Sequence, residues 1–275
     1  MIQAYIDETG TDDQAKIVAM IGFVSSYKRW RKLDREWEGV LNPADEISPP
    51  KKRRVFHATD CLGKEGRGDF TGWSKSDRNL LVDKLIPIAR QRTLFAFGSA
   101  FSVQDYNSVV PAWIRKKWIH PYYLCFFHLA NLLVMNRKEF TFPKDEKIAF
   151  TIAHKPKSVG LLTSLYDEIK DNTDIGSILG KMTPYGKPAE DIPIQSADLI
   201  CYLVRTFWEK EHFVPGSAHR RTRALMANLL ARDPSNGSFR FLEPHFLSPE
   251  ALRGFVRAYE DTHQQAGDWK WNPQT

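Results

Sequence analysis

The sequence predicts an α/β fold in which a mixed five-stranded sheet is flanked by helices. The first observation behind this prediction is a pair of apolar, strand-favouring runs at residues 2–7 and 16–25. A polar turn joins the two runs, so we expect a hairpin. The second observation is that strand-like and helical segments alternate from residue 93 onward. Three early strands followed by such alternation are typical of a mixed sheet with helices on its faces.

Strand-like patterns occur at five places in the chain. They are residues 2–7, 16–25, 93–102, 147–153 and, with a weaker pattern, 175–182. We expect the first strand to be central, so that Asp7 emerges at the end of the sheet near its middle. Side chains alternate along a strand, so Tyr5 and Asp7 should share one face and Ala4 and Ile6 the other.

Helical periodicity marks most of the remaining chain. The expected helices are residues 27–41, 76–92, 120–137, 159–170, 195–210, 218–231 and 248–264. The first of them is amphipathic, because Trp30, Leu33, Trp37 and Leu41 recur at helical spacing. The longest apolar stretch of the chain, residues 122–135, is too short and too polar to cross a bilayer, so we expect a buried helix there.

The chain is expected to divide into a main domain and an extension. Residues 1–212 contain all the expected strands and form the main domain. Residues 42–75 interrupt it as an irregular insertion rich in proline, glycine and charge, and loops of this length are usually functional or disordered. Residues 213–275 are expected to form a C-terminal helical extension.

The composition is that of an ordinary globular protein. Of 275 residues, 42% are apolar and 26% are charged. No secretory signal follows Met1, and the three cysteines show neither metal-binding spacing nor a disulfide framework. We therefore expect a cytoplasmic protein that does not enter a membrane.

An excess of positive charge favours a polyanionic partner. The formal net charge is +6 and the pI is about 9.1. The cations gather in three clusters: Lys51, Lys52, Arg53 and Arg54; Arg115, Lys116 and Lys117; and Arg220, Arg221 and Arg223. Nucleic acid is the usual partner of such clusters, and we nominate the first two for binding it. A solvated basic surface is the alternative.

The first strand ends in two adjacent carboxylates, in the stretch "AYIDETG" at residues 4–10. A partly desolvated carboxylate such as Asp7 is costly unless it is paired, hydrogen-bonded or bound to a metal. The alternative is that the pair ends the strand as an ordinary solvated turn. Glu8 alternates to the opposite face from Asp7, and a turn or salt-bridge role is as open for it as metal binding.

Asp198 raises the same question on a helix. We place it in the first turn of the helix 195–210, with Ser196 or Gln195 as a possible N-cap. Acidic residues in a first turn are favoured by the helix dipole and need no further function. However, Asp198 shares a helix face with Cys201, Tyr202 and Arg205 by its spacing of three, four and seven residues. That side is less polar than a solvent face should be, so Asp198 is also expected to point into protein.

Two carboxylates that converge from a strand tip and a helix start suit Mg²⁺ or Mn²⁺. Magnesium takes oxygen ligands and keeps several waters, so a few carboxylates are enough to hold it. In two-metal sites the ions lie roughly 4 Å apart, where one activates water and the other stabilises the leaving oxygen of a phosphodiester. We expect Asp7 and Asp198 to come together in such a site.

Three short motifs carry a resemblance to a known family. "YIDETG" lies near the N-terminus, "FHATD" follows a charged excursion, and "IQSADLICY" opens a late helix. In this order they resemble the DUF3800 family, over roughly residues 3–205. The resemblance implies a ribonuclease H-like fold and a metal-dependent, nuclease-like site. It also implies that Asp7 is the carboxylate of the central strand and Asp198 that of the final helix.

The chain departs from the family pattern at two positions. Thr9 stands where the family usually has serine, which keeps the hydroxyl. His154 follows the fourth expected strand, where the family typically has a carboxylate. Three interpretations of His154 stay open: a ligand for manganese or a later transition metal, a proton shuttle to the attacking water, or the mark of a site that has lost activity.

Two further residues are nominated near the carboxylates. His57, in "VFHATD", is a candidate ligand or acid–base group, with a local hydrogen bond in a turn as the alternative; Asp60 is favoured less. Gln195 is expected to cap its helix or to orient Asp198 by a hydrogen bond.

These residues together predict a metal-dependent nuclease. We expect hydrolysis of a phosphodiester by metal-activated water, with Asp7, Asp198, His154 and His57 as catalytic candidates. DNA and RNA are equally compatible with the charge. The alternative is a catalytically inactive module on the same fold that binds nucleic acid or another protein. A hydrolase of small nucleotides is a third possibility, which basic clusters distant from the cleft argue against.

Overall fold

A six-stranded mixed sheet forms the centre of the molecule. The computed structural model describes residues 1–10, 14–43, 53–118, 121–136, 146–153, 159–172, 174–183, 186–230 and 244–265. The strands are β1 (Ile2–Thr9), β2 (Ile17–Ser26), β3 (Phe95–Ser102), β4 (Ile148–Ala153), β5 (Leu179–Thr183) and β6 (His245–Leu247). Their order across the sheet is β5-β4-β1-β2-β3-β6.

The strand directions make the sheet mixed, as expected. β1 and β2 form the antiparallel hairpin, and β3 pairs antiparallel with β2. β4 pairs parallel with β1, β5 parallel with β4, and β6 parallel with β3. β1 is therefore central, as predicted, with the parallel β4 on one side and the antiparallel β2 on the other.

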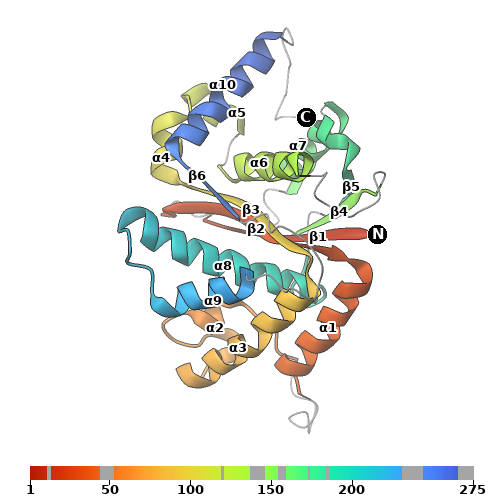
Figure 1. The fold of residues 1–275 in the computed structure, drawn as a ribbon, viewed down its shortest axis with the longest axis vertical. Coiled ribbons are helices and arrows are strands. Elements are labelled where there is room, and N and C mark those ends of the chain that lie inside the picture. Colours follow the sequence, from red (N-terminus) through yellow and green to blue (C-terminus); the bar gives the residue numbers. More distant parts are fainter. Residues whose placement is uncertain are drawn as a thin grey trace.

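Helices cover both faces of this sheet (Figure 1). On one face lie α4 (Val103–Val109), α5 (Ala112–Trp118), α6 (Tyr122–Met135), α7 (Val159–Asn172) and α10 (Pro249–Gln265). On the other lie α1 (Tyr27–Leu41), α2 (Ala58–Leu62), α3 (Lys75–Arg92), α8 (Ile192–Phe213) and α9 (Arg220–Leu230). The 3-10 turns η2 (Gly68–Phe70) and η5 (Asp174–Ser177) complete the described elements.

Each face of the sheet has its own hydrophobic core, and β1 contributes to both. Ala4 and Ile6 pack with α6 and α7, whereas Tyr5 packs with α1, α3 and α8. This confirms the predicted alternation along β1. It also places Asp7, which shares a face with Tyr5, on the side of α8.

Two local features explain where β1 and β2 run. β2 is a continuous apolar run buried on both faces, as its place inside the sheet requires. β1 is followed by Gly10, whose φ of 77° lies in the left-handed region. A Cβ at that position would come within 2.0 Å of the Ile17 carbonyl oxygen, so glycine suits this turn.

The expected number of strands was wrong by one. β6 is a strand of three residues in the C-terminal segment, between the two helices that we expected there, and it extends the sheet beyond β3. Such a strand is too short to carry an alternating pattern, and it forms because β3 offers it an open edge. The boundary after residue 212 stays a prediction.

Several helices also differ from the sequence-based expectation. α4 and α5 were not expected, and the insertion, in its described part 53–75, contains α2 and η2. The predicted helix 27–41 is confirmed with its four inward residues Trp30, Leu33, Trp37 and Leu41 buried. Among the described residues, no helix combines the length and apolarity that a bilayer crossing requires.

Candidate metal centre

Asp7 lies on the central strand, where three strands run side by side. In the register of the sheet it is opposite Ile21 of β2 and Ala153 of β4. Its side chain is partly buried on the α8 side of the sheet. β1 continues to Thr9, so Asp7 precedes the turn and does not form part of it. The interpretation of Asp7 as an ordinary solvated turn residue is therefore wrong.

Asp198 lies in the second turn of α8, which corrects our placement in a first turn. The helix begins at Ile192, with Asp191 as the N-cap residue and a proline in the first turn, so neither Ser196 nor Gln195 is the cap. The first turn of α8 contains no acidic residue. The helix dipole acts mainly on the terminal turn, so it does not account for Asp198.

The carboxyl groups of Asp7 and Asp198 lie close together between β1 and α8 and act on each other's pKa. Burial, followed by the charges of Asp198 and Glu8, raises the pKa of Asp7 well above its usual range. Burial also raises the pKa of Asp198, whereas His57 and the Ala58 amide oppose that rise. Two acids in this arrangement favour holding a proton or a cation between them.

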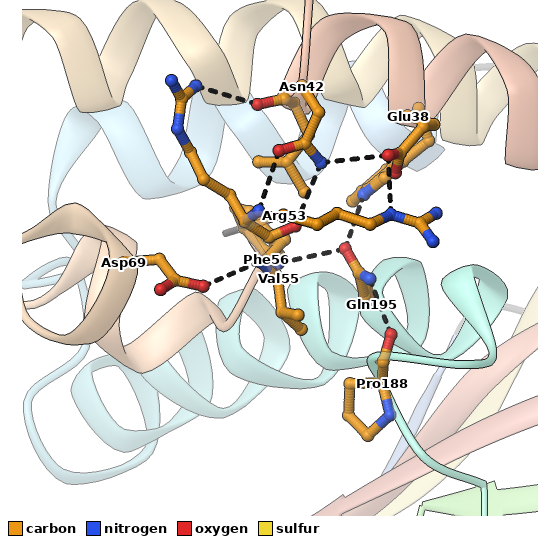
Figure 2. A network of polar contacts seen from close by, with 11 residues as sticks. Glu38, Asn42, Arg53, Val55, Phe56, Asp69, Pro188 and Gln195 are labelled. Atoms are coloured by element: carbon orange, nitrogen blue, oxygen red, sulfur yellow. Dashed lines mark hydrogen bonds and ion pairs between the residues drawn. The ribbon is translucent and has the colours of Figure 1, made fainter. Parts of the chain in front are cut away.

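The third wall of the site is the segment of the insertion that leads into α2, residues 53–57 (Figure 2), together with Ala58 at the start of that helix. Its amides are held by side chains from other elements. The Val55 amide donates to Asp69 Oδ2 at 2.8 Å, and the Phe56 amide donates to Gln195 Oε1 at 3.0 Å. The Ala58 amide donates to Asp198 Oδ2 at 2.7 Å. These bonds fix the segment along α8 and orient the Asp198 carboxylate.

Gln195 is the polar centre of this arrangement and is 2% exposed. Besides the Phe56 amide, its Oε1 accepts the indole N–H of Trp37 at 3.0 Å, and its Nε2 donates to the Pro188 carbonyl at 2.7 Å. Gln195 thus ties α1, the insertion and the loop before α8 together (Figure 2). These hydrogen bonds of Gln195 reach Asp198 only indirectly, through the segment that leads to Ala58.

A row of aromatic rings anchors the same segment to α1. Trp37 meets Phe56 edge to face at 5.7 Å between ring centroids, and Phe56 meets Phe70 at 6.0 Å. Phe70 in turn contacts Trp73 at 5.6 Å. Aromatic pairs of this geometry add to the stability that burial alone provides. The insertion is therefore a packed part of the site in its described portion.

His57 follows the anchored segment and lies beside the carboxylates. Its charge lowers the pKa of Asp198, which places the two groups close together. The imidazole is half exposed, and its Nδ1 is 3.5 Å from Asp60 Oδ2. Asp60 Oδ1 is in turn 3.7 Å from Nε of Arg67. His57 therefore has one side toward Asp60 and remains accessible to solvent.

Two side chains of α8 complete the surroundings of Asp7. The Cys201 thiol donates to the backbone carbonyl of Asp7 at 3.5 Å. Burial, then the charges of Asp7 and Asp198, raises the pKa of this thiol well above its usual range, so it stays protonated. Arg205 lies near enough to oppose that rise. Its spacing of seven residues from Asp198 was visible in the sequence, but we did not nominate it.

Glu8 and His154 are the two other residues that the sequence suggested as metal ligands. The charge of Glu8 contributes to the raised pKa of Asp7, so Glu8 lies near the pair although it alternates to the other face. His154 lies outside the described residues. The described part of β4 ends at Ala153, the residue opposite Asp7.

The donor chemistry of the pair fits a hard divalent cation. Asp7 and Asp198 supply carboxylate oxygens, of which Asp198 Oδ2 already accepts the Ala58 amide. Magnesium is commonly held by one or two carboxylates, with waters or substrate oxygens in the other positions. In the part of the chain that the structure describes, no three His, Cys, Asp or Glu side chains are arranged to hold a metal ion.

The nominated basic clusters are separated by the sheet. Arg53 pairs with Glu38 at 2.6 Å, while Arg54 donates to the Leu41 carbonyl at 2.9 Å and lies over the Trp73 ring. Lys51 and Lys52 lie outside the described residues. Arg115, which donates to Asn107, and the exposed Lys116 belong to α5 on the opposite face of the sheet. The side chain of Lys117 is not among those described.

Comparison with known proteins assigns the chain to no family. No model of a known protein family matches the chain, and a search of curated proteins found no significant match.

Proposed function

We propose that the protein is a metal-dependent hydrolase of phosphodiester bonds with a ribonuclease H-like fold. The observation that carries this proposal is the meeting of Asp7 and Asp198, which come from opposite ends of the main domain. Both acids belong to motifs of the DUF3800 resemblance. Their proximity is what that resemblance requires of a strand carboxylate and a helix carboxylate.

The architecture supports the ribonuclease H-like interpretation. The sheet is mixed, β1 is central, and Asp7 lies near its C-terminal end. Asp198 comes from α8, the helix that follows β5 and packs across β1 and β2. A carboxylate pair between a central strand and such a helix is the arrangement that the resemblance implies.

Each residue of the site has a definable chemical role in this proposal. Asp7 and Asp198 would hold Mg²⁺ or Mn²⁺, and the Ala58 amide orients Asp198 for this task. When bound, the cation supplies an activated water and neutralises charge on the phosphate. His57, accessible and close to Asp198, is placed to accept or donate a proton. Arg205 adds positive charge beside the pair.

A second candidate function is a nucleic-acid-binding or protein-interaction module that has lost catalysis. The observation that favours it is that, among the described residues, Asp7 and Asp198 belong to no group of three His, Cys, Asp or Glu side chains that could hold a metal ion. The position where the resemblance expects an acid is His154 in this chain. The two candidates differ in whether bound nucleic acid is cleaved.

A cleavage assay separates the two functions. Single- and double-stranded DNA and RNA are incubated with the protein in Mg²⁺, in Mn²⁺ and in EDTA. We expect cleavage with a divalent metal, no cleavage in EDTA, and loss of at least 100-fold in rate in Asp7→Ala and Asp198→Ala, because each removes a metal ligand. Asp167→Ala, which changes an exposed acid on α7, is the matched control.

Metal binding is measured separately by calorimetry with Mn²⁺. We expect the wild type and Asp167→Ala to bind and the two site variants to bind at least tenfold more weakly. Binding of nucleic acid without cleavage under every metal condition would favour the inactive module. Cleavage that persists in Asp7→Ala would remove the carboxylate pair from the mechanism.

A further inference from the structure

The solvent-facing side of α1 is a row of cations. Lys28, Arg31, Lys32 and Arg35 are all exposed, and they recur at intervals of three and four residues. Residues at this spacing lie on one side of a helix. We call these four residues the α1 basic face. None of them was among the basic residues that the sequence led us to nominate.

Two of the three acidic residues of α1 pair with cations outside the α1 basic face. Glu36 forms a bidentate pair with Arg92 of α3, at 2.5 and 2.8 Å. Glu38 pairs with Arg53 of the insertion at 2.6 Å. Asp34 is the exception: it is half-buried, burial raises its pKa, and Arg31 of the face, like Arg53, acts on its charge and opposes that rise. The exposed side of α1 therefore keeps an excess of positive charge.

In two of the three basic clusters found in the sequence, described cations are engaged in ion pairs, hydrogen bonds or ring contacts. Arg53 and Arg54 are engaged by Glu38, the Leu41 carbonyl and the Trp73 ring. In α9, Arg221 pairs with Asp83 and Arg223 pairs with Glu211. Cations committed to such contacts contribute less to counterion release when a polyanion binds than exposed ones do.

The α1 basic face is joined rigidly to the candidate metal centre. On the inner side of α1, the Trp37 indole donates to Gln195, which lies about one helical turn before Asp198 on α8. Trp30 and Leu33 bury the rest of that inner side against the sheet. A polymer bound along α1 is thus held in a fixed relation to the carboxylate pair.

We propose that the α1 basic face binds the phosphate backbone of the nucleic acid on which the proposed nuclease site acts. The inference rests on the proposed function for the identity of the polymer. From the first to the last of the four residues there are seven helical steps, or about 10 Å along the helix, which corresponds to roughly three phosphate steps of a B-form strand. The contacts are to phosphate, so the face adds affinity without sequence preference.

Salt dependence provides the test, because each phosphate contact contributes a known slope. Binding of labelled single-stranded DNA and RNA is measured in EDTA between 50 and 300 mM KCl, about the range where counterion release dominates. The variant carries Lys28→Gln, Arg31→Gln, Lys32→Gln and Arg35→Gln, because glutamine keeps helix propensity while removing charge. The control carries Lys75→Gln, Lys84→Gln, Lys210→Gln and Arg257→Gln, which remove equal charge from exposed positions on three other helices.

We expect the slope of log K against log salt to become shallower by about 3 in the α1 variant, since each single-strand contact contributes about 0.7. The corresponding loss of affinity near 0.1 M salt is roughly 10² to 10³-fold. The control variant should keep the wild-type slope. Two double variants, Lys28→Gln with Lys32→Gln and Arg31→Gln with Arg35→Gln, should each lose about half of this effect if the fourfold variant does not fold.

Three results would overturn the inference. They are an unchanged slope in the α1 variants, an equal loss in the control, and wild-type binding to phosphatidylserine vesicles in place of nucleic acid. The outcome for the proposed function is separate. If the wild type cleaves nucleic acid and the α1 variants bind it normally, the proposed nuclease function stands and the proposed role of the α1 basic face is wrong. If nucleic acid binds through the α1 basic face and is not cleaved with any metal, the binding role of that face stands and the proposed nuclease function is wrong.

Discussion

Asp198 of α8 lies close to Asp7 of β1, and its Oδ2 accepts the amide of Ala58 at 2.7 Å. Three segments that are far apart in the chain therefore meet at one carboxylate. The contact explains why both "FHATD" and "IQSADLICY" lie beside "YIDETG" in space. Single substitutions can therefore test the charge of the site, the pKa of its carboxyl groups and the hydrogen bonds that hold it in place.

We expect Asp7→Asn to raise the stability of the metal-free protein. The amide keeps the shape of the side chain and removes a buried negative charge from beside Asp198. The expected gain is about 1 kcal/mol, or about 2–4 °C in Tm for a chain of this size. Thermal melting in EDTA measures it, with Asp167→Asn as the exposed control. A Tm several degrees lower would mean that the Asp7 carboxylate is structural.

The raised pKa of Asp7 predicts that the metal-free protein loses stability as the pH rises. In the unfolded chain the carboxyl titrates near its ordinary value of about 3.9. Between that value and the raised native pKa, the folded protein holds a proton that the unfolded chain has released. The free energy of unfolding therefore falls across this window, by at most about 1.4 kcal/mol per pH unit for one proton.

The difference between the wild type and Asp7→Asn isolates this effect. Urea unfolding in EDTA between pH 5 and 8 should show the variant becoming more stable relative to the wild type as the pH rises, until the native pKa is passed. The raised pKa of Asp198 acts in the same direction. A difference that stays constant with pH would contradict the raised pKa of Asp7.

Replacing Gln195 should weaken the support of the site. Gln195→Met removes the acceptor for two buried donors, the Phe56 amide and the Trp37 indole. Each donor left without a partner costs roughly 1–3 kcal/mol, so we expect a loss of about 2–4 kcal/mol measured by urea unfolding. Gln91→Met, at an exposed position on α3, is the control. In the background of Trp37→Phe the loss should shrink by about 1 kcal/mol, and full additivity would show that the two side chains are not coupled.

Arg78 is expected to hold the loop that follows α2. Its guanidinium is buried and donates to the carbonyls of Cys61 at 2.6 Å and Gly63 at 3.0 Å. Arg78→Met should cost about 3 kcal/mol, because these carbonyls lose charged donors. It should also speed tryptic cleavage after Lys64, because the Arg78 guanidinium also donates to the Lys64 carbonyl, at 3.5 Å. Lys84→Met on the same helix is exposed and should change neither property.

His154→Asp tests the departure from the family pattern. If His154 stands where the proposed site would use an acid, the substitution should preserve or raise Mg²⁺-dependent cleavage, because a carboxylate suits magnesium better than an imidazole does. Initial rates in Mg²⁺ and in Mn²⁺ are compared with those of the wild type and of His154→Ala. Complete loss of cleavage in His154→Asp would mean that the imidazole has a role of its own.

Local patterns accounted for most of the elements of this fold. The spacing of Trp30, Leu33, Trp37 and Leu41 predicted the helix and its buried side, because helical periodicity is visible within a few turns. The apolar runs predicted β1 to β5, and the order of the elements predicted a mixed sheet with β1 at its centre. The start of α8 was misplaced, since serine and glutamine before Asp198 resembled a cap while the helix begins earlier at Ile192.

Contacts between segments that are distant in the sequence could not be predicted from such local patterns. β6 forms because the edge of β3 provides hydrogen-bonding partners, which no stretch of three residues can signal by itself. The backbone amide that holds Asp198 belongs to Ala58, and an amide donor has no residue type by which a sequence could reveal it. The chain alone therefore supplied the identities of the acids and the elements that carry them. Folding supplied their orientation, because burial and hydrogen bonds depend on which segments pack together.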